Sequence, residues 1–200
     1  MIRKEEAAVK TDPLAVVLLA AGAGRRFEGD KLFYSIDGIP MYRRAAGLVS
    51  GLGDEAAVKI VVTGDERIAS DLEKSGFTVV WNREPERGIS RSAALGVEAA
   101  EMAGAGAVCF LVCDQPWLRR ETLAGFLAAW KTSRKSMGSL TFHGRAGNPA
   151  VFGKTWWEEL KQLSGDRGGR QVLNRHPEEV FFYEAAEERE LEDVDRKPGM

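Results

Sequence analysis

Glycines and cationic side chains alternate along one short stretch of the sequence, LAAGAGRRFEGDK (residues 19–31). Glycines let the main chain approach a ligand and present its N–H groups, while Arg and Lys neutralise phosphate. A basic strand-to-helix turn is the alternative, since a glycine pair alone does not decide. GAGRRF lacks the third glycine of a dinucleotide fingerprint and no Gly-Lys-Ser/Thr follows, which disfavours dinucleotide oxidoreduction and P-loop hydrolysis. The stretch predicts a triphosphate-binding loop.

Carboxylates that could hold a metal occur at two places. Asp114 follows an apolar run, and an acidic group at the end of a buried strand is costly unless a cation meets it. Mg²⁺ accepts such a carboxylate together with phosphate oxygens and water, although an Asp before Pro116 also suits a plain turn. Asp193 and Asp195 flank Val194, so a short strand would put both carboxylates on one face. They could join Asp114 on a metal or belong to a solvated acidic tail.

Other polar residues of the sequence give weaker signals for chemistry. Gly88–Ser92 opens a predicted helix, where free N–H groups and hydroxyls bind an anion or a base, but Ser90 or Ser92 also suits a plain N-cap. His143 and His176 lack partners at metal-ligand spacing, so no zinc site is expected. No nucleophilic triad is readable. The spacing of Cys109 and Cys113 puts them on one face of a strand, as small core residues of a protein in a reducing compartment.

Alternating strand and helix patterns must position these residues. Strands are predicted at 14–20, 58–63, 77–81 and 107–112, and helices at 40–50, 66–74, 89–102 and 120–131, which indicates right-handed crossovers and a mostly parallel sheet. Later strands are predicted at 137–142, 149–152, 180–184 and 191–194, and helices at 154–163 and 169–175, with 143–148 as a hairpin-like loop. Ligands of such sheets bind beyond the carboxyl ends of the strands, where the loop at 19–31 and Asp114 both fall.

Length, net charge and the distribution of apolar residues limit the number of domains and the kinds of partner. Two hundred residues suit one domain, here a tail over 1–13 and a domain over 14–200, with a nucleotide-binding part to about 131 and an acceptor-binding part after it. A net charge of −2 disfavours a nucleic-acid binder. The charged start lacks the apolar core of a signal peptide, and the longest apolar run, 14–21, is too short to span a bilayer. We expect a cytoplasmic protein with no membrane or nucleic-acid partner.

Six segments in order resemble the molybdenum cofactor cytidylyltransferases, which belong to the glycosyltransferase-A-like nucleotidyltransferase group together with the guanylyltransferase for the same cofactor. They are LAAGAGRRF…DK (19–31), WNREPERGISRSAALG (81–96), FLVCDQPWL (110–118), RAGNPAVF (145–152), LSGDRGGR (163–170) and LEDVD (191–195). The resemblance implies a three-layer α/β/α sandwich with a mostly parallel, mixed sheet, Rossmann-like and of the nucleotide-diphospho-sugar transferase type.

The resemblance also implies roles. Arg26, Lys31 and Asp114 would be catalytic, and Asp114 and Asp195 would bind Mg²⁺ or Mn²⁺. The nucleotide would be bound by Leu19, Ala20, Ala21, Gly22, Gly24, Arg25, Arg26, Lys31, Gly88, Ser90 and Ser92. The acceptor would be bound by Arg145, Gly147, Asn148 and Pro149.

Base and acceptor follow from the same resemblance. Cytidylyl members resemble this chain in LAAG and G-[LM]-S-x-S, so Ala21 and Gly88–Ser92 favour CTP over GTP. The chain departs from the family at Gly24 (usually Ser), Phe27 (usually Met), the Glu28-Gly29 spacing, Asn148 (usually His), and after Asp195, where Thr-Pro-Glu-Asp is usual.

The implied activity is CMP transfer from CTP to the terminal phosphate of the molybdenum-pterin cofactor, which releases pyrophosphate. Alternatives are GTP as donor, a sugar phosphate or alcohol phosphate as acceptor, or a non-catalytic factor that hands the cofactor to a target molybdoenzyme.

Overall fold

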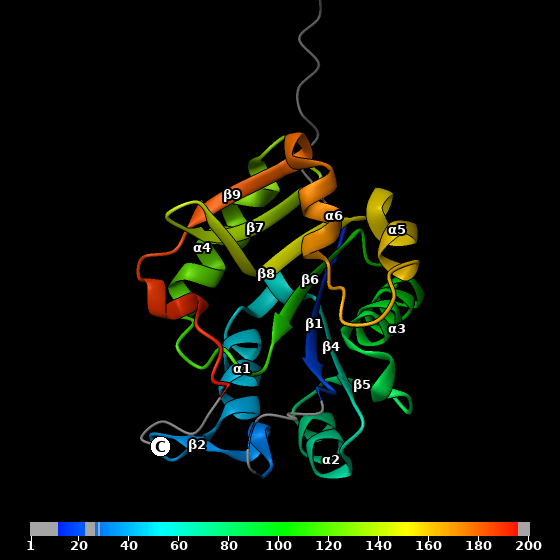
Figure 1. The fold of residues 1–200 in the computed structure, drawn as a ribbon, viewed down its shortest axis with the longest axis vertical. Helices are drawn as coiled ribbons and strands as arrows, with labels where there is room; N and C mark the ends of the chain where they lie inside the picture. Colours follow the sequence, from blue (N-terminus) through cyan, green and yellow to red (C-terminus); the bar gives the residue numbers. More distant parts are fainter. Residues whose placement is uncertain (1–11, 23–26, 28, 196–200) are drawn as a thin grey trace, which may run out of the picture.

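A computed structural model describes residues 12–22, 27 and 29–195, with the side chain of Glu55 left out. A seven-stranded sheet runs through this part of the chain (Figure 1). Its strands are β1 (Leu14–Ala20), β4 (Val58–Thr63), β5 (Thr78–Trp81), β6 (Ala107–Val112), β7 (Met137–Phe142), β8 (Arg145–Gly153) and β9 (Val180–Glu184). A separate hairpin pairs β2 (Ser35–Ile36) with β3 (Ile39–Pro40).

Helices cover both faces of the sheet. The α-helices are α1 (Met41–Ser50), α2 (Glu66–Lys74), α3 (Ile89–Met102), α4 (Arg120–Thr132), α5 (Trp157–Lys161) and α6 (Arg170–Arg175). Short 3-10 helices are η1 (Lys31–Phe33), η2 (Gly53–Ala56), η3 (Pro85–Arg87), η4 (Lys154–Trp156), η5 (Pro177–Glu179) and η6 (Glu188–Leu191). Buried residues of α1, α2 and α4 pack on one face, and those of α3, α5 and α6 on the other. The predicted three-layer α/β fold is confirmed.

The strand order places a crevice beside β1. The order is β5-β4-β1-β6-β8-β7-β9. The chain leaves β1 toward β4 and β5 and then crosses to the other side of β1 to form β6, all parallel. Crossovers in opposite directions separate the connecting loops beyond the carboxyl ends of β1 and β6, which is where open α/β sheets bind ligands. The sheet is mixed because β8 runs antiparallel to both of its neighbours.

The α3 side of the sheet is packed closely enough to require a small residue. A β-carbon on Gly96 would lie 2.7 Å from Val17 of β1 and 3.2 Å from Phe110 of β6. Ala93, Val97 and Ala100 continue this buried face of α3. The close approach brings the start of α3 to the carboxyl end of β1.

Most predicted elements are confirmed, several of them residue for residue. The predicted helix 154–163 is instead η4 followed by the short α5. The predicted loop 143–148 is only a two-residue turn, because His143 (φ 47°) and Gly144 (φ 78°) reverse the chain at once and leave residues 145–148 in β8. The β2–β3 hairpin, closed by Asp37-Gly38 with positive φ at both residues, was not predicted although Asp-Gly is a strong hairpin signal.

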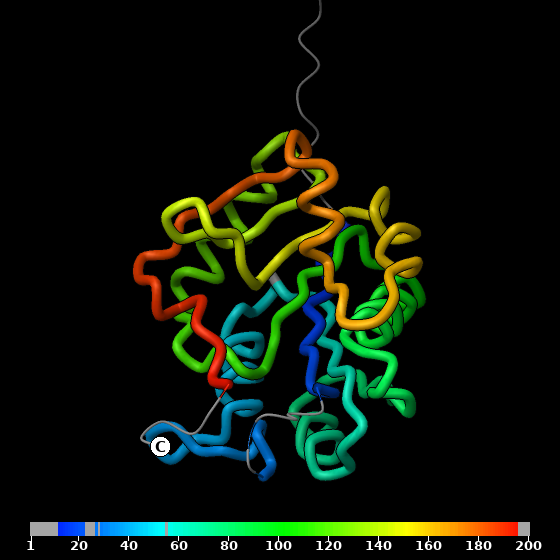
Figure 2. Tube along the Cα trace, in the orientation of Figure 1, coloured from blue at the N-terminus to red at the C-terminus, as the bar shows by residue number. Residues whose placement is uncertain are grey.

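The predicted strand at 191–194 is wrong. The segment leaves η6 and continues without pairing to the sheet. Its main chain bonds to a loop instead: the N–H of Val194 donates to the carbonyl of Asp114, 2.9 Å away. Figure 2 shows this red C-terminal segment returning to the carboxyl end of β6.

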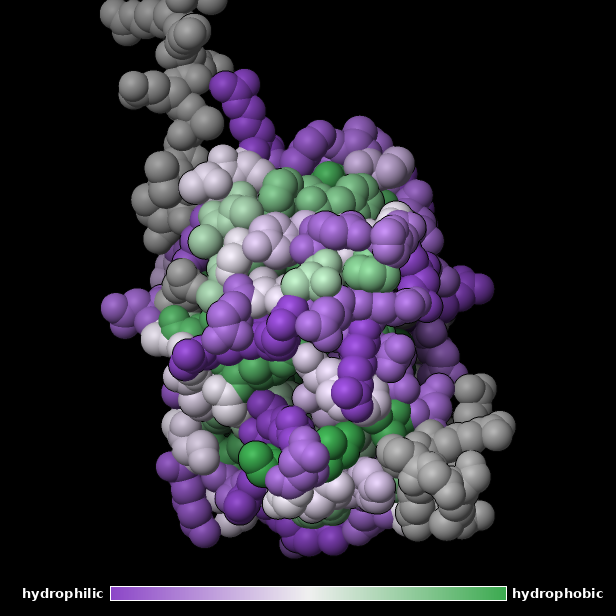
Figure 3. All heavy atoms as spheres, turned by 90° about the vertical axis from the view of Figure 1, so that its left-hand side faces the viewer, coloured by the Kyte–Doolittle hydropathy of each residue, from purple (hydrophilic) through white to green (hydrophobic). Residues whose placement is uncertain are grey.

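Apolar surface is scattered. Figure 3 views the side of the molecule that is at the left in Figure 1, where hydrophilic residues separate small apolar areas. The large apolar side chains that are exposed, Ile39, Trp81, Met102 and Phe182, come from separate elements. Among the described residues, no helix is long and apolar enough to cross a membrane.

Candidate functional site

A cavity of about 280 Å³ opens at the carboxyl ends of β1 and β6. Its wall contains seven residues predicted from the sequence to contact the nucleotide or its metal: Leu19, Ala21, Gly22, Lys31, Gly88, Ser92 and Asp114. The parallel register, which pairs Leu19 with Val112, explains why the loop after β1 and Asp114 face the same space. A neighbouring cavity of about 230 Å³ contains Ala20 and shares Ala21, Gly22 and Lys31.

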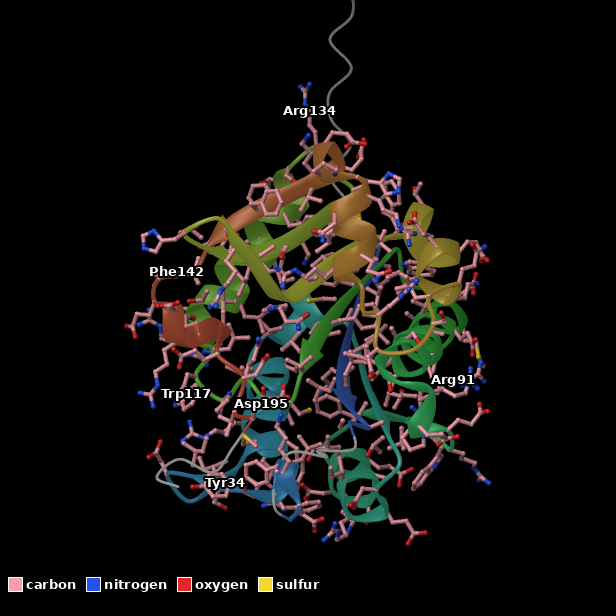
Figure 4. All side chains as sticks on the ribbon, viewed as in Figure 1. Tyr34, Arg91, Trp117, Arg134, Phe142 and Asp195 are labelled. Atoms are coloured by element: carbon pink, nitrogen blue, oxygen red, sulfur yellow. The ribbon has the colours of Figure 1, made fainter. Side chains whose placement is uncertain are left out.

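Lys31, which lines the cavity of about 280 Å³, forms ion pairs with two carboxylates. Its Nζ lies 2.7 Å from Oδ2 of Asp114 and 3.3 Å from Oδ1 of Asp195. The Lys31 side chain is 12% exposed, whereas that of Asp195 is 61% exposed. The three groups carry a net charge of −1, so the cluster holds the Lys31 ammonium beside carboxylate oxygens that a second cation can use. Figure 4 shows Asp195 near the carboxyl end of β6.

The carboxylates hold Lys31 in its charged form. Burial on its own lowers the pKa of Lys31, but hydrogen bonds and charge attraction from Asp114 and then Asp195 outweigh it, so that the pKa is raised above its ordinary value. The pKa of the Asp193 carboxyl is also raised, by burial and then by the negative charges of Asp114 and Asp195, but for an acid this favours the uncharged form. Asp193 thus lies in the same electrostatic field as the other two carboxylates.

The carboxylates at this site fit a hard divalent cation whose remaining ligands would come from a substrate. Among the described residues, no group of three or more His, Cys, Asp or Glu side chains could hold a metal alone. Asp114 and Asp195 offer two carboxylates, and Mg²⁺ commonly takes one or two together with substrate phosphates and water.

Another cavity, of about 250 Å³, adjoins the cavity of about 280 Å³, and Leu19 and Ile89 line both. We call the cavity of about 280 Å³ the first cavity and the cavity of about 250 Å³ the second cavity. It contains three of the four residues predicted for the acceptor, Arg145, Gly147 and Asn148. They reach this place because β8 is antiparallel to β6: Ala150 pairs with Phe110, so residues 145–148 extend past the carboxyl end of β6. The fourth, Pro149, is buried in the strand and does not line the cavity.

Two consecutive residues mark the boundary between the cavities. Asp114 lines the first and Gln115 lines the second. Near the end of the described chain, Asp193 lines the second cavity while Asp195 contacts Lys31 in the first. The carboxylate pair therefore lies at the border between the two spaces.

The contacts at the start of α3 show whether Ser90 or Ser92 caps this helix. The cap residue is Gly88, which has no side chain to bond, so neither Ser90 nor Ser92 is an N-cap. The Ser90 hydroxyl donates to the Arg87 carbonyl at 3.4 Å, which gives it a structural partner. The Ser92 oxygen accepts a bond from the buried side-chain amide of Asn82 at 2.9 Å, so its own proton is directed elsewhere. Ser92 suits ligand contact better than Ser90.

Three predicted residues, Gly24, Arg25 and Arg26, lie outside the described residues. Conversely, the structure adds residues that were given no role: Asp166 lines the first cavity, and Gly168, Gly169 and Arg170 line the second. All four belong to the segment LSGDRGGR, whose three glycines and two arginines were a usable signal. Among the described residues, no carboxylate pairs with the exposed Arg170, whereas Arg145 lies 3.6 Å from Glu188.

Two adjoining cavities at the carboxyl ends of the strands of a three-layer α/β sheet agree with a nucleotidyltransferase, the class that the family comparison shows. Residues 16–180 match the MobA-like NTP transferase domain, and the chain belongs to that family. The chain is 28% identical over 189 residues to the purine catabolism protein PucB of Bacillus subtilis, covering 90% of each. It is also 35% identical over 119 residues to the bifunctional protein GlmU of Rhizorhabdus wittichii, of whose length it spans 25%.

Solved structures share the fold. Rv0371c from Mycobacterium tuberculosis aligns with a TM-score of 0.76 and 21% identity over 92% of this chain and 93% of that one. A complex of Rv0371c with manganese aligns with a TM-score of 0.68 and 19% identity, over 88% and 89% of the two chains. The 4-diphosphocytidyl-2C-methyl-D-erythritol synthase of Anaerococcus prevotii aligns at 0.75 and 14%, covering 96% and 95%.

Proposed function

We propose that this nucleotidyltransferase moves CMP from CTP to the terminal phosphate of the molybdenum-pterin cofactor and releases pyrophosphate, in a reaction that depends on Mg²⁺ or Mn²⁺. The observation that carries the proposal is the pair of adjoining cavities, with Lys31, Asp114 and Asp195 at their border. A transferase needs its donor and acceptor side by side, and this border is where the two phosphates would meet.

Charge supports the donor's orientation in the first cavity. Lys31 lies at the end next to Asp114, which suits the triphosphate. Gly88, Ser92 and Asp166 also line this cavity and offer oxygen acceptors and main-chain groups suited to a nucleoside. Asp114 and Asp195 would hold the divalent cation, which shields the charge of the triphosphate.

CTP as the donor rests on the cytidylyl-type residues Ala21 and Gly88–Ser92. Three of these residues, Ala21, Gly88 and Ser92, line the first cavity. The Asn82–Ser92 hydrogen bond leaves the Ser92 proton for an acceptor atom on the nucleotide. The structural neighbour from Anaerococcus prevotii, named as a diphosphocytidyl synthase, supports the use of a cytidine nucleotide on this fold.

The second cavity suits an acceptor that combines a flat ring system with an anion. Its wall includes the apolar residues Phe110, Phe152 and Leu173, and the hydrogen-bonding residues Gln115, Ser139 and Asn148. Arg145 and Arg170 also line it and can bind a phosphate. A pterin that carries a phosphate meets both requirements.

The proposed reaction does not require a strong general base. A phosphate oxygen of the acceptor attacks the α-phosphorus of CTP, the bond from that phosphorus to the bridging oxygen breaks, and pyrophosphate leaves with the electron pair. Because the attacking phosphate is already an anion, the protein has to align the two substrates and stabilise charge on the leaving group. Lys31 lies where it can do the second, and Arg26 would assist.

A different acceptor is the second candidate. Asn148 lines the acceptor cavity at the position where the cytidylyltransferase family usually has His, so the contacts to the acceptor differ from the usual ones. The Anaerococcus neighbour is named for a product in which a diphosphocytidyl group is joined to the alcohol methylerythritol, which makes an alcohol phosphate the next acceptor to test.

Two measurements test the proposal. Thermal shifts with CTP, GTP, ATP and UTP plus Mg²⁺ should be largest for CTP, since a ligand at about 100 times its Kd stabilises by about 2.7 kcal/mol. A larger shift with GTP would overturn the choice of base. Phosphorus NMR with CTP and each acceptor should then show pyrophosphate release with the molybdenum-pterin cofactor; release with only a sugar or alcohol phosphate would reassign the acceptor.

A further inference from the structure

Glu190 is a buried carboxylate outside both cavities. Its side chain is 2% exposed. It accepts four hydrogen bonds: from the main-chain N–H of Arg119 (3.1 Å), from Arg119 Nη2 (3.3 Å), and from the main-chain N–H groups of Ala186 (3.2 Å) and Glu187 (3.3 Å). An unpaired buried carboxylate is costly, so these donors explain why the charge is tolerated.

The four donors come from two separate segments. Arg119 ends the loop that begins at Asp114 after β6, whereas Ala186 and Glu187 precede η6. A second contact joins the same segments, because the Arg189 guanidinium lies over the ring of Trp117, 4.3 Å from its centroid. Glu190 therefore ties the chain before Leu191 to the loop that carries Asp114.

The chain after Glu190 carries the carboxylates of the site. Among the described residues, 192–195 form no helix or strand, so side-chain and main-chain contacts set their position. Gln115 donates to the Leu191 carbonyl at 3.2 Å, and the Val194 N–H donates to the Asp114 carbonyl at 2.9 Å. The Val194 side chain is buried against Phe27 and Met41. The route from Glu190 to Asp195 is only five residues long.

We propose that Glu190 is a positioning residue that fixes Asp195 beside Asp114 and so sets the affinity of the metal–nucleotide complex. This inference rests on the proposed function, in which Asp114 and Asp195 hold the divalent cation. Glu190 touches neither substrate. It acts by holding the start of the Leu191–Asp195 segment against the Asp114 loop, as outer-shell partners orient metal ligands elsewhere.

Glu190→Gln tests the inference with little change of volume. Its amide nitrogen cannot accept from the N–H groups that one carboxylate oxygen now serves. Mn²⁺ affinity in the presence of CTP, measured by electron paramagnetic resonance, should fall about tenfold. CTP affinity without metal should stay unchanged, and amide exchange at Val194 should quicken. Glu192→Gln, an exposed charge change in the same segment, is the matched control and should bind Mn²⁺ as the wild type does.

A double-variant comparison separates positioning from general weakening. If Glu190 acts through Asp195, then Glu190→Gln should add little to the loss of Mn²⁺ affinity caused by Asp195→Asn. Full additivity, or wild-type Mn²⁺ affinity with wild-type exchange at Val194, would overturn the inference. Arg119→Lys keeps the charge and the main-chain donor and should give a smaller loss in the same direction, should Glu190→Gln fold poorly. A wild type that shows no metal-dependent CTP binding would instead refute the proposed function.

Discussion

Gly88 and Gly165 stand in direct contact, close enough that a β-carbon on Gly88 would lie 2.4 Å from the Gly165 carbonyl carbon. The φ of Gly88 is 82°, a conformation that L side chains avoid. The Ser90 N–H donates to the Gly165 carbonyl at 3.2 Å, which joins the two loops. Asp166 and Gly88 line the first cavity from these two loops, so the contact builds part of the wall of the proposed nucleotide site.

We therefore expect Gly88→Ala to lower the free energy of unfolding by about 1–3 kcal/mol, through strain and overpacking. It should also weaken nucleotide binding, because the wall must move. Urea unfolding and calorimetry with CTP measure the two effects. Gly47→Ala is the opposite control: Gly47 is exposed in α1 with nothing within 4 Å of an added β-carbon. It should raise stability by about 0.5–1 kcal/mol. Equal stability of the two variants would refute the argument.

The two cysteines should be inert in the folded protein. Cys109 and Cys113 are at most 1% exposed, and burial raises the pKa of both thiols. Because the thiolate is the reactive form, neither side chain has the access or the charge to react. A thiol reagent such as dithionitrobenzoate should titrate both cysteines in guanidinium chloride and neither one in native buffer. Rapid labelling of the native protein would show that β6 opens locally.

Sequence patterns located the parts of the site that follow strands. β1 and β6 are short, almost fully buried apolar runs, so their ends were readable and placed Lys31 and Asp114 at one edge of a parallel sheet. The predicted approach of Asp195 to Asp114 agrees with their shared contact to Lys31. The short strand expected at 191–194 was wrong, because this segment does not pair with the sheet.

The features that could not be predicted from the sequence depend on contacts between distant segments. The bond from Val194 to Asp114 uses main-chain groups that every residue has, so no pattern marks it. Likewise, the antiparallel direction of β8 follows from a two-residue turn at His143-Gly144, where a longer loop was expected. The placement of Arg170 in the wall of the second cavity depends on how the 163–170 segment crosses the start of α3, which periodicity does not report.

An ion pair between α1 and α2 makes stability depend on pH. Arg43 donates to both oxygens of Asp71, at 2.9 and 2.8 Å, and the Tyr42 hydroxyl donates at 3.0 Å. The bonds from Arg43, more than that from Tyr42, hold the pKa of Asp71 below its ordinary value. The contribution is therefore present above the unfolded pKa of about 3.9 and is lost as the pH falls through the folded pKa.

Asp71→Asn should consequently be less stable than the wild type near neutral pH, and the difference should shrink as the pH falls below about 4. Urea unfolding at neutral and acid pH gives both values. Asp54→Asn, an exposed change in η2, serves as the control and should show no such dependence. A difference that persists unchanged in acid would mean that packing, rather than the charge, accounts for the loss.

Lys31 lines the cavity proposed for the nucleotide, and its ammonium also forms ion pairs with the carboxylates of both Asp114 and Asp195. Lys31→Ala should remove a phosphate contact and leave the two negative charges without their shared counterion. We expect kcat/KM for CTP-dependent pyrophosphate release to fall by about 10²–10³, the size typical of one lost electrostatic donor. Lys31→Arg keeps the charge and should recover part of the rate, while Lys74→Ala, exposed at the end of α2, should match the wild type. A rate for Lys31→Ala within twofold of the wild type would remove Lys31 from the proposed catalytic group, whatever the acceptor proves to be.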